Sequence, residues 1–218
     1  MSRANTGPGM PPRGARRTIG WRLLAGLAAV VGGLGFLASA GYIQAKALLA
    51  QQLIEHAWQE NRASGEATQR PWSWADTVPV GRLEFVRQRR SMIVLDGDAG
   101  RTLAFGPGLR AGSAMPGASG NSVISAHRDT HFAVLRHLVV GDLVRVESVD
   151  GRTVDYRVDR LDVVDEHDLR VTEQHGRDEL TLVTCWPFDA VQPGGPLRYV
   201  VQAGRVAGGA RAEVASIH

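Results

Sequence analysis

The sequence predicts a mainly β domain, an eight-stranded barrel with one or two short helices, preceded by a membrane-spanning helix near the N-terminus. Three observations support this fold class. Residues 23–45 contain no charged side chain, residues 78–206 consist of short β-rich runs separated by turn signals, and the apolar content of 44% is ordinary for a protein that buries a core. About eight short strands with so little helix favour a closed barrel, because closure removes exposed sheet edges.

The composition excludes several classes of protein. One cysteine in 218 residues excludes an intramolecular disulfide framework and a cysteine-rich metal cluster. The net charge of +3 is unevenly placed, because residues 1–45 hold five arginines and no acidic residue. The rest of the chain has 20 basic against 22 acidic residues, so a nucleic-acid-binding role, which needs positive charge on the folded surface, is not expected.

The first 45 residues predict a basic cytoplasmic leader over residues 1–22 and a transmembrane signal-anchor helix over residues 23–45. At about 1.5 Å per residue, 23 residues span the roughly 30 Å of a bilayer core. Arginines on the N-terminal side favour a cytoplasmic N-terminus and an exported body. A cleavable signal peptide is the alternative, since Ala38-Ser39-Ala40 fits the small-residue cleavage pattern. Either reading places the body outside the cytoplasm.

Residues 46–77 predict a juxtamembrane helix followed by a linker. Apolar side chains recur near helical spacing over residues 46–60, with His56 expected on the solvent side. Residues 61–77 are polar and contain Trp72 and Trp74, which suit either interfacial anchors or a clasp packed on the domain.

The barrel is expected over residues 78–206, with a flexible tail over residues 207–218. Residues 106–120 form a long Gly- and Pro-rich loop, and residues 129–138 suit a short helix. Asp150-Gly151 predicts a two-residue hairpin turn, and the broken alternation at Arg160-Leu161 predicts a bulge. The runs that predict strands are residues 82–86, 92–95, 102–105, 122–125, 143–149, 152–158, 180–184 and 197–201.

Two residues at strand ends are candidates for nucleophilic chemistry. Cys185 ends the apolar run T-L-V-T-C, and a thiol held by a rigid scaffold is placed like a nucleophile, although a lone cysteine is more often a small buried hydrophobe. His127 ends V-I-S-A-H, and an imidazole beside a thiol can relay protons because it titrates near the working pH. A turn histidine bonded to backbone is the alternative.

Further side chains could complete such a site. Arg198 begins the final strand and could stabilise an oxyanion, while Asp129 or Asp189 could orient the imidazole. Cys185, His127 and His131 could instead be zinc ligands. A metal is not expected, because the glutamate of an H-E-x-x-H pattern is missing and one thiol is a thin set of soft ligands.

The ordered motifs S-A-H-R-D-T-H-F, T-L-V-T-C-W-P-F and P-L-R-Y-V-V resemble those of a sortase. The resemblance covers nearly all of residues 78–203 and is strongest to the Gram-negative (proteobacterial) class. It implies an eight-stranded barrel and a cysteine transpeptidase that cleaves a C-terminal LPxTG-like sorting signal. Cys185 would be the nucleophile, His127 the general acid and base, and Arg198 the oxyanion stabiliser, with no cofactor.

The same resemblance sets expectations for the substrate side. Four residues are expected next to the substrate: Thr184, Trp186, Ser125 and Asp129. Implied partners are a secreted protein bearing the sorting signal, an amine acceptor (peptidoglycan or protein) and the inner membrane, with the catalytic domain facing the periplasm. Two alternatives are a non-catalytic anchored barrel and a hydrolysis-only cysteine peptidase. An L,D-transpeptidase is disfavoured, because V-T-C-W stands where S-x-G-C is expected.

Overall fold

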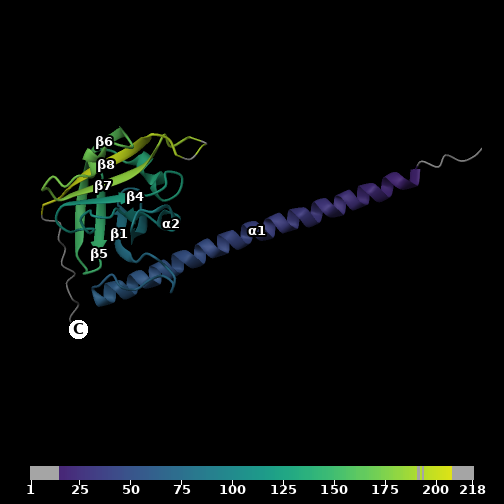
Figure 1. Ribbon diagram of the computed structural model, residues 1–218, viewed down its shortest axis with the longest axis horizontal. Helices are drawn as coiled ribbons and strands as arrows, with labels where there is room; N and C mark the ends of the chain where they lie inside the picture. The colour runs from purple at the N-terminus through teal and green to yellow at the C-terminus, as the bar shows by residue number, and fades with distance from the viewer. Residues whose placement is uncertain (1–14, 191, 193, 208–218) are drawn as a thin grey trace, which may run out of the picture. The chain divides into compact units, whose positions relative to one another are not determined.

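The computed structural model describes residues 15–190, 192 and 194–207, and it forms two compact units that divide between Leu48 and Leu49 (Figure 1). Most of the predicted basic leader and of the predicted tail lies outside the described residues. Helix α1 (Ala15–Ser64) runs through both units without a break. The predicted anchor and juxtamembrane helix are therefore parts of one continuous helix.

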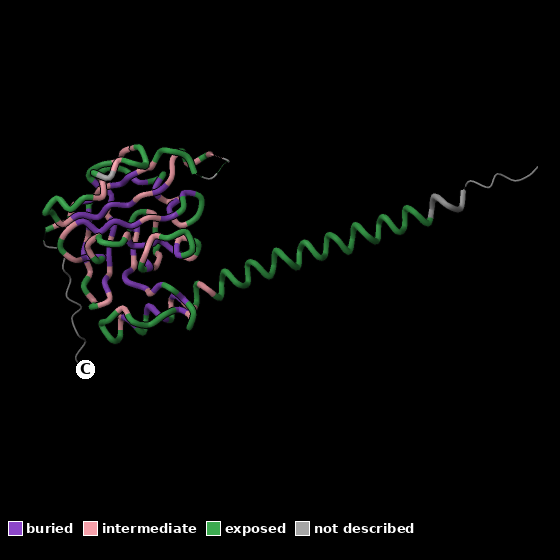
Figure 2. Tube along the Cα trace, viewed as in Figure 1, coloured by how far each residue is buried: buried purple, intermediate pink, exposed green. Residues whose placement is uncertain are grey.

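The first unit contains the apolar part of α1. The segment Gly20–Ser64 includes a window with a mean hydropathy of 2.0, which is long and apolar enough to cross a membrane by length and composition. Its side chains up to Leu49 are exposed, as the green part of the helix in Figure 2 shows. Apolar side chains without protein neighbours are what a lipid-facing helix requires.

The second unit is a closed eight-stranded barrel in the order β1-β2-β3-β4-β7-β8-β6-β5. Pairing is parallel between β2 and β3 and between β4 and β7, and antiparallel elsewhere. The predicted fold class is thus confirmed. The elements are β1 (Pro79–Phe85), β2 (Arg90–Asp96), α2 (Gly100–Leu103), β3 (Gly108–Leu109), β4 (Asn121–Ser125), 3-10 helix η1 (His131–His137), β5 (Leu143–Ser148), β6 (Thr153–Asp165), 3-10 helix η2 (Leu169–Thr172), β7 (Glu179–Trp186) and β8 (Leu197–Arg205).

The strand predicted over residues 102–105 is wrong. This segment forms α2 and a turn, in which Thr102 O accepts hydrogen bonds from two backbone N–H groups further along the chain. The strand beside β2 is β3 instead, at Gly108. A Cβ at position 108 would lie 2.2 Å from the Gly97 carbonyl oxygen, so only glycine fits this sheet position.

The predicted bulge and hairpin are present, but the turn is not the expected two-residue one: the Ser148 N–H bonds to the Arg152 carbonyl at 2.9 Å, so residues 149–151 form a three-residue loop. Gly151 has a φ of +87°, and the turn joins β5 to β6. In β6 the register shifts between Val158 and Arg160, after which the strand continues beside β8 as far as Asp165. The bulge therefore carries the end of β6 to the start of β8, where Arg198 lies.

The barrel interior is filled by alternating apolar residues of the strands, coloured purple in Figure 2. The fully buried residues include Leu83, Phe85, Val144, Tyr156 and Leu182. Because the core fixes which face of each strand points inward, it also fixes which side chains point out of the barrel.

The last part of α1 packs on the barrel unit through Ile54, Ala57 and Trp58, all of which are buried. Asn61 is fully buried and makes four hydrogen bonds, accepting from Thr68 N and Gln69 N and donating to Gln69 O and Pro79 O. These bonds join the helix end to the following loop and to β1.

The two linker tryptophans behave differently. Trp72 contacts the Phe105 ring edge-on at 4.9 Å between centroids, while Trp74 is 82% exposed. The clasp alternative therefore describes Trp72, and an interfacial anchor remains the alternative for Trp74. His56 is exposed, as expected from the sequence.

Candidate active site

Three adjacent strands bring the candidate catalytic residues together. Strands β4 and β7 run parallel, and Ser125 of β4 lies opposite Val183 of β7. His127 follows Ser125 by two residues, and Cys185 follows Val183 by two residues. The Ala126 N–H, bonded to the Val183 carbonyl at 3.2 Å, continues the pairing towards the histidine. The register of a parallel pair thus brings His127 and Cys185 to the same end of the sheet, where both line one cleft.

Arg198 reaches the same place from the other side of Cys185. Strands β7 and β8 are antiparallel, and Cys185 lies directly opposite Arg198. Directly opposed residues share one face of a sheet. The preceding pair on that face is Val183 and Val200, while Leu182 and Val201 point into the core.

Cys185, His127 and Arg198 line one cleft of about 360 Å³, here called the Cys185 cleft. The thiol is half-buried, as expected for a side chain at the mouth of a cleft rather than in the core. The β6–β7 segment supplies one wall, with three acidic residues. The lining comprises Asp98, Leu103, Arg110, Ser125, Ala126, His127, Val164, Asp165, Glu166, Asp168, Val171, Thr172, Val183, Thr184, Cys185, Arg198 and Val200.

The four residues expected on the substrate side divide into two pairs. Ser125 and Thr184 line the cleft, whereas Trp186 and Asp129 do not. Thr184 is buried, with only 3% of its surface exposed, and its hydroxyl donates a hydrogen bond to the Ala126 carbonyl at 2.7 Å. That bond ties β7 to the residue before His127, so the hydroxyl serves the architecture of the site.

Trp186 belongs to an aromatic cluster instead. Its ring stacks on Tyr199 and meets Phe188 edge-on, both at 5.6 Å between centroids. The Arg136 guanidinium lies over the Phe188 ring at 5.1 Å. This cluster packs the start of the β7–β8 loop against β8.

Arg198 already has partners in this structure. Its Nη2 donates to the Glu166 carboxylate at 2.5 Å, and its Nη1 donates to the Gly195 carbonyl at 2.7 Å. Both side chains of the ion pair are partly exposed, 26% for Arg198 and 38% for Glu166. Exposed pairs of this kind contribute at most about 1 kcal/mol, so an oxyanion can compete for the guanidinium.

Among the described residues, no hydrogen bond joins Asp129 or Asp189 to His127, so the structure selects neither as an orienting group. His131 lies on the next element and is half-buried. Burial, with a smaller contribution from His127, lowers the pKa of His131. The part of the chain that the structure describes contains no cluster of three or more His, Cys, Asp or Glu side chains that could hold a metal ion.

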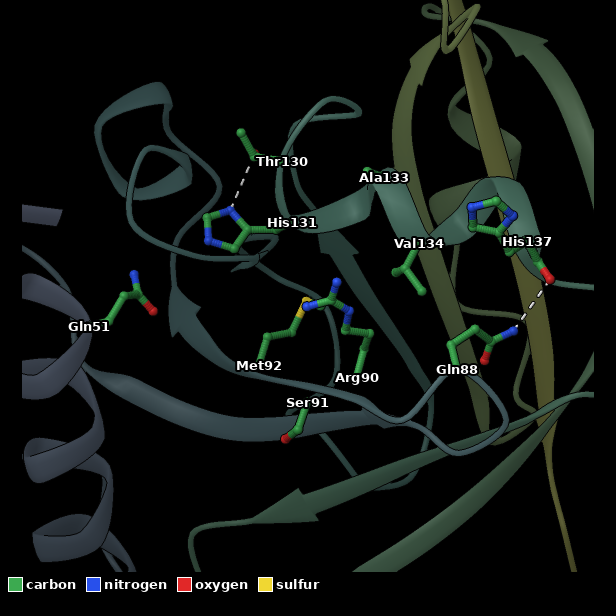
Figure 3. Close-up of a pocket in the computed structure, with 10 residues that line it drawn as sticks. All are labelled: Gln51, Gln88, Arg90, Ser91, Met92, Thr130, His131, Ala133, Val134 and His137. Atoms are coloured by element: carbon green, nitrogen blue, oxygen red, sulfur yellow. Dashed lines mark hydrogen bonds between the residues drawn. The ribbon is translucent and has the colours of Figure 1, made fainter. Parts of the chain in front are cut away.

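A separate pocket of about 570 Å³ lies between η1, β2 and α1 (Figure 3). Gln51 of α1, Arg90 and Met92 of β2 and His131 of η1 surround it. It includes neither Cys185 nor His127 nor Arg198. The residues expected from the sequence to carry nucleophilic chemistry therefore line the Cys185 cleft and not this pocket.

Arg128 was not singled out by the sequence. It is only 5% exposed, and its Nη2 donates to the carbonyls of Ala190 and Gln192 at 3.1 and 2.5 Å. The sequence signal was its place in S-A-H-R-D, directly after the histidine. Nothing local in that motif indicates a partner more than 60 residues away.

Comparison with known proteins identifies the family of the barrel. The sortase domain family matches residues 84–206, which is more than half of the chain. Sortase D of Bacillus subtilis is 33% identical over 127 residues, which cover 58% of this chain and 63% of that protein. The chain thus spans less than two thirds of that relative.

Solved structures agree as well. Sortase C1 of Streptococcus agalactiae superposes with a TM-score of 0.51 at 29% identity, covering 58% of this chain and 66% of that one. Sortase C-1 of Actinomyces oris superposes with a TM-score of 0.54 at 26% identity, covering 69% of this chain and 98% of that one. These relatives come from Gram-positive bacteria, so they do not show the Gram-negative class expected from the motifs. On the match of its barrel to the family, the chain belongs to the sortases.

Proposed function

We propose that this protein is a membrane-anchored cysteine transpeptidase that cleaves a C-terminal, LPxTG-like sorting signal and transfers the product to an amine. The observation that carries the proposal is the register of β4, β7 and β8, which brings His127, Cys185 and Arg198 into one cleft. A thiol, an imidazole and a guanidinium are the nucleophile, the proton carrier and the oxyanion donor that acyl transfer through a thioester requires.

In the first half-reaction the Cys185 thiol passes its proton to His127, and the Sγ thiolate attacks the carbonyl carbon of the scissile bond, so that the carbonyl oxygen becomes an oxyanion. Arg198, together with backbone N–H groups near Thr184, donates hydrogen bonds to that oxygen. The carbon–nitrogen bond then breaks as His127 gives a proton to the leaving amine. This leaves a thioester on Cys185.

The second half-reaction reverses these steps with a new nucleophile. The incoming amine attacks the thioester carbonyl, and His127 takes its proton. The carbon–sulfur bond breaks and Cys185 leaves as the thiolate, which takes the proton back from His127 and regenerates the starting state. Arg198 again holds the oxyanion, so its contact with Glu166 must open or be shared during each half-reaction.

The cleft suits an extended peptide. Val164, Val171 and Val183 line it and are partly exposed, so an apolar residue of a sorting signal has a surface to cover. The exposed, uncharged part of α1 supports a single-pass anchor in the cytoplasmic membrane. The five N-terminal arginines support a catalytic unit on the outer face.

We place the protein in a Gram-negative envelope, with the catalytic unit in the periplasm. The support is the run T-L-V-T-C-W-P-F-D-A-V-Q-P-G-G-P-L-R-Y-V-V, which resembles the signature of that class. The proposed partners are a secreted protein that bears the sorting signal and an acceptor amine on peptidoglycan or on another protein.

The test uses the full chain in detergent micelles, a panel of LPxTG-like peptides, and hydroxylamine as the acceptor, with products identified by intact mass. We expect a hydroxamate of the N-terminal fragment, cut after the fourth motif residue. Cys185→Ala should abolish it, and Arg198→Ala should lower kcat by about 10²–10³-fold. His127→Ala should lower kcat by about 10²–10⁴-fold.

His137→Ala is the matched control, because His137 is an exposed imidazole on η1 outside the Cys185 cleft. It should stay within twofold of wild type. A carboxylic acid in place of the hydroxamate would show a hydrolysis-only peptidase. If folded Cys185→Ala and wild type behave alike with every peptide, the proposal is wrong.

A further inference from the structure

We propose that Arg128 is a positioning residue that fixes the β7–β8 loop so that Arg198 is held at the Cys185 cleft. This inference rests on the proposed function and adds a residue to its machinery. Arg128 does not line the cleft, so it acts through the loop rather than on the substrate.

Arg128 has an unusual environment for a buried cation. A buried cation normally has a carboxylate partner, because removing a charge from water is costly. Among the described residues Arg128 forms no ion pair, and its guanidinium is satisfied by backbone carbonyls. The guanidinium thus donates hydrogen bonds to carbonyls that backbone N–H groups would bond in a regular element.

Those carbonyls belong to Ala190, Gln192 and Gly194, the last at the long distance of 3.5 Å from Nη1. All three lie in the segment between β7 and β8, which begins just after Cys185 and ends just before Arg198. The Arg128 side chain therefore bonds to three carbonyls of the loop that connects Cys185 to Arg198.

The same loop links the two arginines. The Gly194 carbonyl accepts from Arg128, and the next carbonyl, that of Gly195, accepts from Arg198 at 2.7 Å. Gly194 and Gly195 both have positive φ, +84° and +106°, which lets consecutive carbonyls face different partners. Any change in the loop at Gly194 is therefore passed directly to the group that holds Arg198.

The histidine belongs to the same unit. Arg128 is the neighbour of His127 in the chain, and Ala126, on the other side of the histidine, is bonded to β7 through Thr184. His127 is thus held between a bond to the nucleophile strand and a clamp on the loop. Removing the clamp should alter the relative placement of all three groups without removing any of them.

The experiment compares Arg128→Met, Arg128→Lys and Arg136→Met with wild type, each as the full chain in detergent micelles. Two readouts are used. The first is kcat and KM for the best peptide of the panel with hydroxylamine. The second is the ratio of the rates at which iodoacetate and iodoacetamide alkylate Cys185 at one pH. Both reagents react with the same thiolate, so their ratio reports positive charge near the sulfur and needs no substrate.

We expect Arg128→Met to lower kcat at least tenfold with KM within threefold, and to lower the alkylation ratio at least threefold. Arg128→Lys keeps the charge but loses the planar fork of donors, so its kcat should lie between those of Arg128→Met and wild type. Arg136→Met removes a positive charge beside the same loop, next to Phe188. It should change neither readout by more than twofold.

If Arg128→Met stays within twofold of wild type in kcat and in the alkylation ratio, as is expected of Arg136→Met, the inference is overturned. If near-UV circular dichroism shows that Arg128→Met does not fold, Arg128→Lys decides. A folded lysine variant with wild-type kcat and ratio overturns the inference, and a folded one at least threefold lower in kcat supports it. If wild type cleaves no peptide, the proposed function fails while the alkylation ratio still tests the role of Arg128.

Discussion

Replacing Thr184 by valine separates the hydrogen bond of this residue from its volume. The hydroxyl donates to the Ala126 carbonyl at 2.7 Å in a buried position, while the rest of the side chain fills space next to the core. Valine has nearly the same shape but no donor. Serine has the donor but lacks the methyl group, so Thr184→Ser is the matched variant.

The magnitude follows from what each change removes. Thr184→Val takes a donor from a buried carbonyl, which costs about 1–3 kcal/mol in free energy of unfolding. For a domain of about 150–250 residues, each kcal/mol shifts Tm by about 2–4 °C, so a loss of about 2 kcal/mol gives about 4–8 °C. Thr184→Ser costs about 1 kcal/mol for the lost methyl group.

Activity should separate the two variants more clearly than stability. Ala126 precedes His127, so a displaced carbonyl moves the imidazole relative to Cys185. We expect kcat/KM of Thr184→Val to fall by about 3–10-fold, because small misplacements of catalytic groups are costly. Thr184→Ser keeps the bond and should stay within twofold of wild type.

The assay is peptide cleavage with hydroxylamine, alongside thermal unfolding followed by near-UV circular dichroism. If Thr184→Val equals wild type in both Tm and kcat/KM, the bond to Ala126 has no role in the site. If serine loses as much activity as valine, packing rather than hydrogen bonding is responsible.

Three further predictions concern other contacts. Asn61→Ala removes four hydrogen bonds from a fully buried side chain and should lower the free energy of unfolding by about 3 kcal/mol, measured by thermal unfolding; an unchanged Tm would contradict its role. Hydrogen bonds from Arg87, the largest cause, and from neighbouring donors lower the pKa of Asp142. The ionised Asp142 therefore stabilises the folded state. Its contribution to the free energy of unfolding is present above the unfolded-state pKa of about 3.9 and is lost as pH falls through the lower folded-state pKa. In Asp142→Asn the free energy of unfolding should therefore depend less on pH below about pH 4. Glu166→Gln frees Arg198 from an exposed ion pair and should raise kcat/KM by up to about fivefold at low salt; a large decrease would show that the pair orients the guanidinium.

Most of the strands, and the meeting of Cys185, His127 and Arg198 at one cleft, could be predicted because their signals are local. Alternating apolar residues, a D-G turn and a broken alternation each lie within a few residues, and the structure has the corresponding strands, hairpin and bulge. Cys185 and His127 were recognisable because each ends an apolar run and stands in a distinctive motif. Local signals of this kind depend on the chemistry of the side chains and on the spacing of apolar residues, and both can be read directly from the sequence.

The failures come from contacts between distant segments. Residues 102–105 have strand-like composition, yet tertiary packing holds Thr102 in a buried turn and puts Gly108 in the sheet. The partners of Arg128 and Arg198 depend on loop backbone conformation, which side-chain pattern does not encode. Trp186 was expected at the substrate because it follows Cys185, but the alternation of β7 turns it to Tyr199 on the other face.

The Cys185 cleft lies at the C-terminal ends of β4 and β7, which are one of the two parallel pairs of the barrel. The C-terminal ends of two antiparallel strands lie at opposite edges of a sheet. Strand β7 and its antiparallel neighbour β8 therefore cannot both bring residues from their C-terminal ends to one site. Strands β4 and β7 are parallel, and their C-terminal ends deliver His127 and Cys185 to one edge. Strand β8 begins at that edge, and its second residue, Arg198, lies opposite Cys185. A slip of β4 against β7 by one residue would exchange the inward and outward faces and place Ala126 or Arg128 opposite Cys185. The hydrogen bonds of Thr184 and of Arg128 lie one on each side of His127, so we expect the loss of either to lower the rate of peptide cleavage.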